Sequence, residues 1–201
     1  MSMSLKRFIA KLLPPRLRRF VAVEQGATAI EFALVLPVVL LIMLGSFEVP
    51  RFVLICQRIA RTSSGVADLV AQADEPITAN QMTDIFTAAK IMMQPYDIVA
   101  NGRIYVSSIN NPSGNGVTLT WQKTNGGLPG VMNIDSKLGL PGSNPSTKMP
   151  ATLVPGSNEE VLASEVYFNY TPVFSNLIYS GSQLYLIAYT RPRNKNLMTS
   201  P

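Results

Sequence analysis

The sequence predicts an α+β protein in which one long amino-terminal helix, able to cross a membrane, carries a small head with an antiparallel sheet of about four strands. Three observations predict this class. The chain of 201 residues opens with a basic segment and a long apolar run. Apolar residues then recur at helical spacing. The second half of the chain contains segments that alternate with the period of two typical of strands.

The apolar run covers residues 27–47 and contains a single charged residue, Glu31. At about 1.5 Å per residue, a helix of this length spans roughly 31 Å, which matches the hydrocarbon core of a bilayer. We therefore expect a transmembrane helix over residues 27–48. The alternatives are a buried helix of a soluble core and a cleavable secretory or lipoprotein signal. Residues 44–46 match the small-residue cleavage site of a secretory signal poorly. A lipoprotein signal would have a small residue before its cysteine, whereas Ile55 precedes Cys56 here.

The net charge of +5 lies entirely in residues 1–26, and residues 27–201 are balanced. Basic residues beside a span mark its cytoplasmic flank, so residues 1–26 are predicted to be a cytoplasmic leader and the head to be extracytoplasmic. Because the excess charge is confined to this flank, we expect the membrane rather than a nucleic acid as partner. The charged leader residues are Lys6, Arg7, Lys11, Arg16, Arg18, Arg19 and Glu24.

The composition argues against an enzyme. The chain has no histidine and one cysteine, Cys56, which removes histidine-based acid–base catalysis, Ser-His and Cys-His pairs, disulfides within the chain and thiolate metal cages. We expect no catalytic residue, no metal and no cofactor. The acidic pairs 74–75 and 159–160 are interpreted as solvated charges, and an anchored enzyme using serine, lysine or carboxylates is kept as a minor alternative.

Residues 49–95 are predicted to continue the helix and then form a second one. Apolar residues at three-and-four spacing indicate one buried face, expected to pack on the chain's own sheet and to bury an inert Cys56 thiol. The first helix should extend from about residue 27 to 73. A capping box of Thr78 and Gln81 starts the second helix, which should end before Pro95. The expected face consists of Phe52, Ile55, Ile59, Val66, Val70 and Ala73 on the first helix, and Ile85, Phe86, Ala89 and Met92 or Met93 on the second.

Residues 96–201 are predicted to form the β-rich head. Alternating patterns predict strands at 103–109, 117–122, 160–170 and 183–191. In the second of these, Val117, Leu119 and Trp121 alternate with polar residues. Residues 124–158 form a loop rich in glycine and proline, for which subunit contact, surface display and a tolerated insertion are the candidate roles.

The segment around Glu31, from Gln25 to Phe32, reads QGATAIEF. With the apolar run that follows and its Pro37, it resembles the processing site of TadE-like pseudopilins of tight-adherence (Flp) pilus systems. Gly26, Glu31 and Phe32 carry the resemblance. It covers about 35 residues closely, and the head agrees with the family only in its pilin-like layout.

The resemblance implies a processed, assembled subunit of the bacterial inner membrane. A prepilin peptidase would cut between Gly26 and Ala27, leaving Glu31 as the fifth residue of the mature chain. Glu31 would pair with the new ammonium of a neighbouring subunit, and Phe32 would belong to the membrane-held helix. The implied partners are the peptidase, pilin and pseudopilin subunits and an inner-membrane assembly platform, with adhesion as the outcome. The alternative is an uncleaved single-span periplasmic scaffold or binding protein, in which Glu31 is only a helix-start acid.

Overall fold

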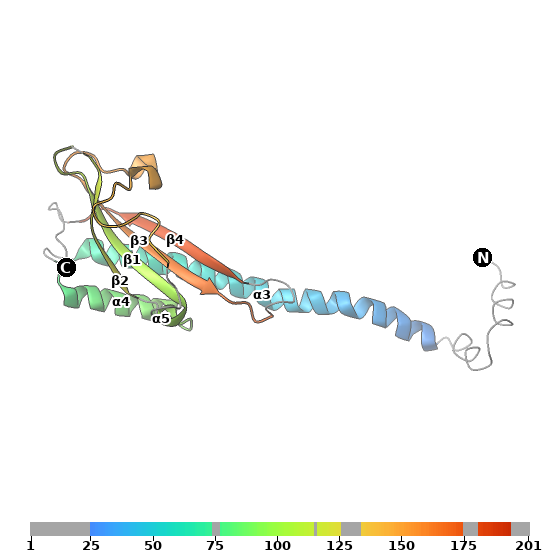
Figure 1. The fold of residues 1–201 in the computed structure, drawn as a ribbon. Coiled ribbons are helices and arrows are strands. Elements are labelled where there is room, and N and C mark those ends of the chain that lie inside the picture. The colour runs from blue at the N-terminus through green and yellow to red at the C-terminus, as the bar shows by residue number, and fades with distance from the viewer. Residues whose placement is uncertain (1–24, 74–76, 115, 126–133, 175–180, 194–201) are drawn as a thin grey trace. The chain divides into compact units, whose positions relative to one another are not determined.

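The computed structural model describes residues 25–73, 77–114, 116–125, 134–174 and 181–193. It confirms the α+β class, because one long apolar helix precedes a four-stranded antiparallel sheet (Figure 1). The chain divides into two compact units, Met1–Val49 and Pro50–Pro201. Most of the predicted leader and the acidic stop at residues 74–76 lie outside the described residues.

Helix α3 extends over Gln25–Gln72, close to the predicted 27–73. In the first unit its side chains are exposed from Thr28 through Met43. This part of the chain therefore has no internal core and shows apolar side chains around the whole helix. In the described part of the chain, α3 is the one helix long and apolar enough to cross a membrane.

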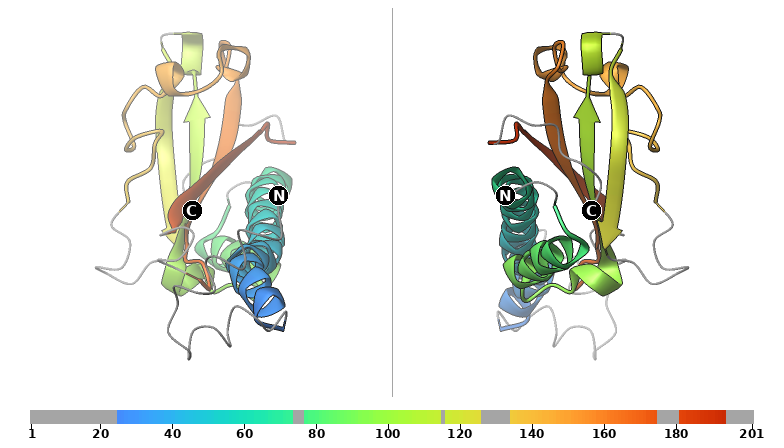
Figure 2. Two further views of the ribbon diagram at one scale, coloured as in Figure 1. Left: turned by 90° about the vertical axis from the view of Figure 1, so that its right-hand side faces the viewer. Right: turned by 90° about the vertical axis from the view of Figure 1, so that its left-hand side faces the viewer.

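In the second unit, α3 packs on the sheet through the predicted apolar face. Ile55, Ile59, Val66 and Val70 are fully buried in one cluster with strand residues, and Phe52 and Ala73 lie at its margin. Small residues let the helix approach closely, and the Ser63 hydroxyl donates a 2.7 Å hydrogen bond to the Ser164 carbonyl. Figure 2 shows α3 beside α4 on one side of the sheet.

Cys56 corrects one expectation. Its thiol was expected to be buried with the apolar face, but it is only half-buried, because it lies beside that face rather than on it. Partial burial still raises the pKa of the Cys56 thiol, since desolvation disfavours the thiolate. A low-reactivity thiol is therefore consistent with its surroundings.

Helix α4 spans Ala79–Met93 and begins with the predicted capping box. The Gln81 amide donates to the Thr78 hydroxyl at 3.2 Å, and the Thr78 amide donates to the Gln81 side chain at 2.8 Å. The inner face is as expected, with Met93 buried and Met92 exposed. A short helix, α5 at Ile98–Asn101, was not predicted; Asp97 caps it by accepting from two backbone amides.

The sheet contains β1 (Gly102–Asn110), β2 (Thr118–Asn125), β3 (Glu160–Tyr170) and β4 (Ser182–Thr190) in the order β2-β1-β3-β4, with every neighbouring pair antiparallel. All four predicted strands are present, within three residues at each end. The two central strands, β1 and β3, are neighbours in the sheet although about 50 residues separate them in the sequence.

A register shift in the β1–β2 pair changes which residues of β2 share a face. Ser108 pairs with Trp121 whereas Ile109 pairs with Leu119, which leaves Thr120 as an extra residue. Trp121 consequently joins the core beneath the helices, while Val117 and Leu119 join a second core on the opposite side of the sheet. The simple alternation expected for this strand is therefore interrupted at Thr120.

The second core is covered by the glycine- and proline-rich loop, whose residues 126–133 lie outside the described part. From Ile134 onward the loop contains two short 3₁₀ helices, Ser146–Lys148 and Ala151–Leu153. Its Leu138 and Met149 are buried against Ile109, Leu119 and Val161. The described part of the loop is thus a layer of the fold, and its role in subunit contact, in surface display or as a tolerated insertion stays a prediction.

The acidic pair at residues 159–160 is not simply solvated. Glu159 is partly exposed and pairs with Arg191 at 3.2 Å, but Glu160 is 6% exposed and accepts a hydrogen bond from the buried Ser108 hydroxyl. The expectation of two solvated carboxylates is therefore wrong for Glu160. Glu160 is buried because β3 pairs with β1, and this pairing cannot be predicted from the residues next to Glu160 in the sequence.

We expect Gly102→Ala to destabilise the head by about 1–3 kcal/mol, because a larger residue at a closely packed site forces its neighbours to move. A Cβ at Gly102 would lie 2.5 Å from the Tyr167 carbonyl oxygen and 2.4 Å from Ile98 Cδ1. Thermal unfolding of the full-length protein in detergent measures the loss. Gly45→Ala is the control, since a Cβ there meets nothing within 4 Å; equal melting temperatures for both variants would contradict the prediction.

Candidate functional site

The residues singled out from the sequence lie in the first turns of α3. Gly26 and Ala27 belong to its first turn, and the side chains of Glu31 and Phe32 are exposed, Phe32 to 66%. In the described part of the chain, no ion pair or side-chain hydrogen bond engages Glu31. The structure thus presents a carboxylate within a fully exposed apolar helix and brings no other charge to it.

This arrangement fixes what Glu31 can do. A carboxylate in an apolar environment is stable only when it is paired, protonated or within reach of water. Among the described residues, no cation forms an ion pair with Glu31. No three metal-ligating side chains gather among the described residues.

A polar cluster around Glu165 was missed by sequence reasoning. Glu165 is fully buried on β3, facing the covering loop. Its carboxylate accepts hydrogen bonds from Tyr185 at 3.0 Å, from Tyr167 at 3.2 Å, from the Lys137 amide at 3.0 Å and from the Ser136 hydroxyl. These donors come from the sheet and from the loop, so Glu165 ties the loop to the sheet.

The available signal for this cluster was an acid inside an alternating strand. Glu165 shares its side of β3 with Val161, Ala163 and Tyr167, all of which are buried. A charged residue at such a position is expected to have several hydrogen-bond partners. Because the sheet and the loop contribute all four of these donors, we assign the cluster a structural role.

The cluster also changes the ionisation of three tyrosines. Burial disfavours the phenolates of Tyr167, Tyr185 and Tyr189, and the nearby Glu165 charge adds repulsion, so all three pKa values are raised, that of Tyr189 to about 12. An unfolded tyrosine ionises near pH 10. Above that pH the unfolded chain releases protons that the folded head retains, so stability falls as pH rises.

We therefore expect the melting temperature of the full-length protein to be insensitive to these groups below about pH 10 and to decrease between about pH 10 and 12. Tyr189→Phe removes one of the three phenols, so it should reduce the pH dependence of the unfolding free energy by about one proton. The substitution breaks no side-chain hydrogen bond of this phenol in the described structure. Chemical denaturation at a series of alkaline pH values gives the slope of the unfolding free energy against pH. An unchanged slope in Tyr189→Phe would contradict the assignment.

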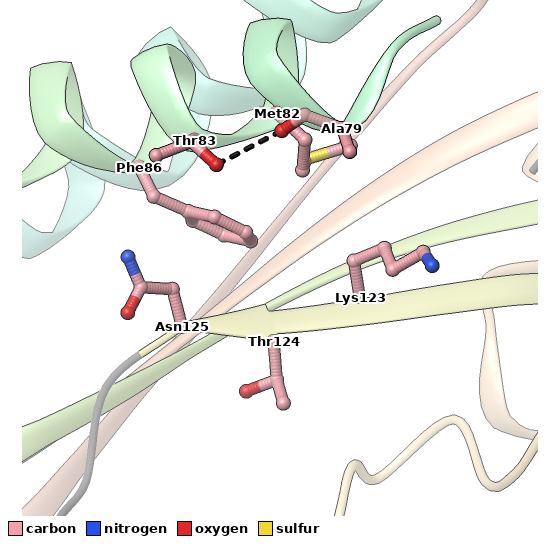
Figure 3. A pocket seen from close by; sticks show the side chains of 7 residues that line it. All are labelled: Ala79, Met82, Thr83, Phe86, Lys123, Thr124 and Asn125. Atoms are coloured by element: carbon pink, nitrogen blue, oxygen red, sulfur yellow. Dashed lines mark hydrogen bonds between the residues drawn. The ribbon is translucent and has the colours of Figure 1, made fainter. Parts of the chain in front are cut away.

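The described residues of the second unit line two surface pockets of similar volume. The first, of about 370 Å³, lies between the start of α4 and the end of β2 (Figure 3). Phe86 and Met82 form its helix side, and Lys123 and Asn125 project toward them from the strand. Four of its seven lining residues are polar. Lys123 is half-buried and Thr83, Thr124 and Asn125 are exposed. The Thr83 hydroxyl donates a hydrogen bond to the Ala79 carbonyl. The second pocket, of about 360 Å³, contains Arg51.

The fold and the site together define a class: an α+β protein with a long amino-terminal helix able to cross a membrane once, an exposed acid near the start of that helix, and a four-stranded antiparallel head. Residues 26–64 match the family model of TadE-like proteins. This match confirms the resemblance carried by Gly26, Glu31 and Phe32, and it begins at Gly26. Neither the curated proteins nor the solved structures gave a match to the chain.

Proposed function

We propose that this protein is a pseudopilin, a minor pilin-like component of a tight-adherence pilus that is required for pilus assembly and surface adhesion. The observation that carries the proposal is the coincidence of the TadE-like match with a processing sequence. The match begins at Gly26, and the acid follows five residues later, inside the apolar run. The same segment is an exposed helix with no internal core.

In this proposal, the precursor lies in the bacterial inner membrane with residues 1–26 in the cytoplasm and the head outside. A prepilin peptidase cuts between Gly26 and Ala27, since glycine lets the backbone extend into a protease cleft. The cut removes the +5 leader and creates an ammonium on Ala27. The charge that retains the amino terminus on the cytoplasmic side is thereby reduced to one.

Assembly then uses the exposed helix. Glu31 pairs with the Ala27 ammonium of a neighbouring subunit, and Phe32 and the apolar side chains after it pack against neighbouring pilin or pseudopilin helices. An unpaired carboxylate in such a core costs several kcal/mol, so the pair acts mainly as a check on register. The inner-membrane assembly platform would move the helix from lipid into the assembly.

The amino terminus of the native protein tests this function. Intact mass and terminal sequencing should give a chain starting at Ala27 in cells that contain the prepilin peptidase, and a chain that retains residues 1–26 in a strand lacking it. A full-length leader in both strains would reject the pseudopilin and favour the uncleaved periplasmic scaffold. A start at another residue would indicate an ordinary secretory signal.

A further inference from the structure

A second feature of the head is a surface pocket lined by a cationic side chain. The pocket of about 360 Å³ is formed by α3, by the connection between α4 and α5, and by the end of β3. Arg51 and Ile55 line it from α3, and Tyr96 and Asn101 line it from the connection and α5. It lies wholly within the unit Pro50–Pro201. Its wall combines aromatic, amide and cationic groups.

Arg51 is the unexplained group in this pocket. Its side chain is half-buried, and its Nη1 atom is covered without any hydrogen-bond partner. Buried donors in folded proteins nearly always have a partner, so this guanidinium can take an acceptor that enters the pocket. A guanidinium is always charged, and its planar fork matches the oxygens of a phosphate.

The acid in the pocket does not fill this role. Asp97 lines the same pocket but forms no salt bridge with Arg51. Its Oδ1 atom accepts from the Val99 amide at 2.9 Å and from the Ala100 amide at 3.2 Å, so it serves as the cap of α5. The amides of Asn101 and Asn169 lie on exposed residues and can donate to an incoming anion.

The position of Arg51 along α3 indicates where the anion comes from. Arg51 follows the predicted span, which ends at residue 48, by three residues, or about 4.5 Å along a helix axis. That is the level of the headgroups, where arginine contacts lipid phosphates and where tyrosines are enriched. Tyr96 and Tyr170 also line the pocket.

We propose that the Arg51 pocket binds a phosphate group, supplied by a phospholipid headgroup of the leaflet on the side of the head. On binding, the Arg51 side chain turns further into the pocket, so that Nη1, which is covered in the unbound structure, becomes accessible and pairs with the phosphate oxygens. The contact holds the head against the membrane before the chain leaves the bilayer. It requires only the membrane span and is independent of cleavage after Gly26.

Native mass spectrometry of the full-length protein, released from nanodiscs containing phosphatidylglycerol, tests the lipid site. We expect wild type to retain one lipid per chain and Arg51→Gln to retain about tenfold less, the effect of losing roughly one charge-assisted contact. Arg61→Gln is the matched control, because Arg61 is exposed on the same helix and no side-chain hydrogen bond or ion pair engages it in the described structure. It should retain lipid as wild type does.

Equal retention by wild type and Arg51→Gln would overturn the proposal, as would an equal loss in Arg61→Gln, which would indicate general attraction to anionic lipid. In a second arm, the arginine side-chain nitrogens are followed by NMR in lipid-free detergent with inorganic phosphate. A shift of the Arg51 signal with no lipid retained would overturn the lipid source. Melting temperatures check folding, and Arg51→Gln should not be lower than wild type, since it removes an unpaired donor.

Discussion

Replacing Gly26 by valine should leave residues 1–26 on the protein in cells that otherwise remove them. A branched side chain at the residue preceding the cut obstructs the extended backbone that a protease cleft requires. We expect the processed fraction to fall by more than about tenfold, which corresponds to roughly 1.4 kcal/mol of lost transition-state stabilisation. Intact mass of the membrane fraction measures it, because the two forms differ by 26 residues.

Gly45→Val is the control for this experiment. It is the same substitution in the same helix, at a position where an added Cβ meets nothing within 4 Å. It should be processed as efficiently as wild type. Normal processing of Gly26→Val would remove the peptidase step from the proposed function, while a loss of processing in both variants would indicate a general defect of membrane insertion.

Replacing Glu31 by leucine should leave processing intact and abolish assembly. The substitution makes the apolar helix more favourable in lipid, so the chain remains in the membrane. It also leaves the Ala27 ammonium of a neighbouring subunit without its carboxylate inside an apolar assembly, and removing one partner of a buried pair is strongly destabilising. We expect at least about a tenfold decrease of the protein in sheared surface filaments, measured by immunoblot against the membrane fraction.

Two comparisons make the Glu31 result specific. Glu31→Asp keeps the charge and should retain part of the assembly, whereas Phe32→Leu keeps an apolar side chain and should assemble nearly as wild type. Surface filaments at wild-type level in Glu31→Leu would reduce Glu31 to an acid that favours a helix start. A simultaneous loss of processing would place the residue in peptidase recognition instead.

Local patterns in the sequence determined most of the elements and the segment around Gly26 and Glu31 that resembles a processing site. The α3 and α4 helices and all four strands were predicted within a few residues, because apolar spacing, the Thr78–Gln81 box and proline positions act over neighbouring residues. Glu31 was also conspicuous in the sequence alone, as the single charge in residues 27–47. Each of these signals is complete within one segment.

Only the tertiary structure decided the features that join distant segments. The order β2-β1-β3-β4, the shift at Thr120, the burial of Glu160 and Glu165, and the orphaned nitrogen of Arg51 all depend on which strand or loop lies opposite. The solvation of a polar group is set by neighbours that are remote in sequence, and no local pattern contains them. The sequence by itself therefore determined the apolar helix that is able to cross a membrane, and the fold decided that Glu160 and Glu165 are buried and that Arg51 has a buried nitrogen without a partner.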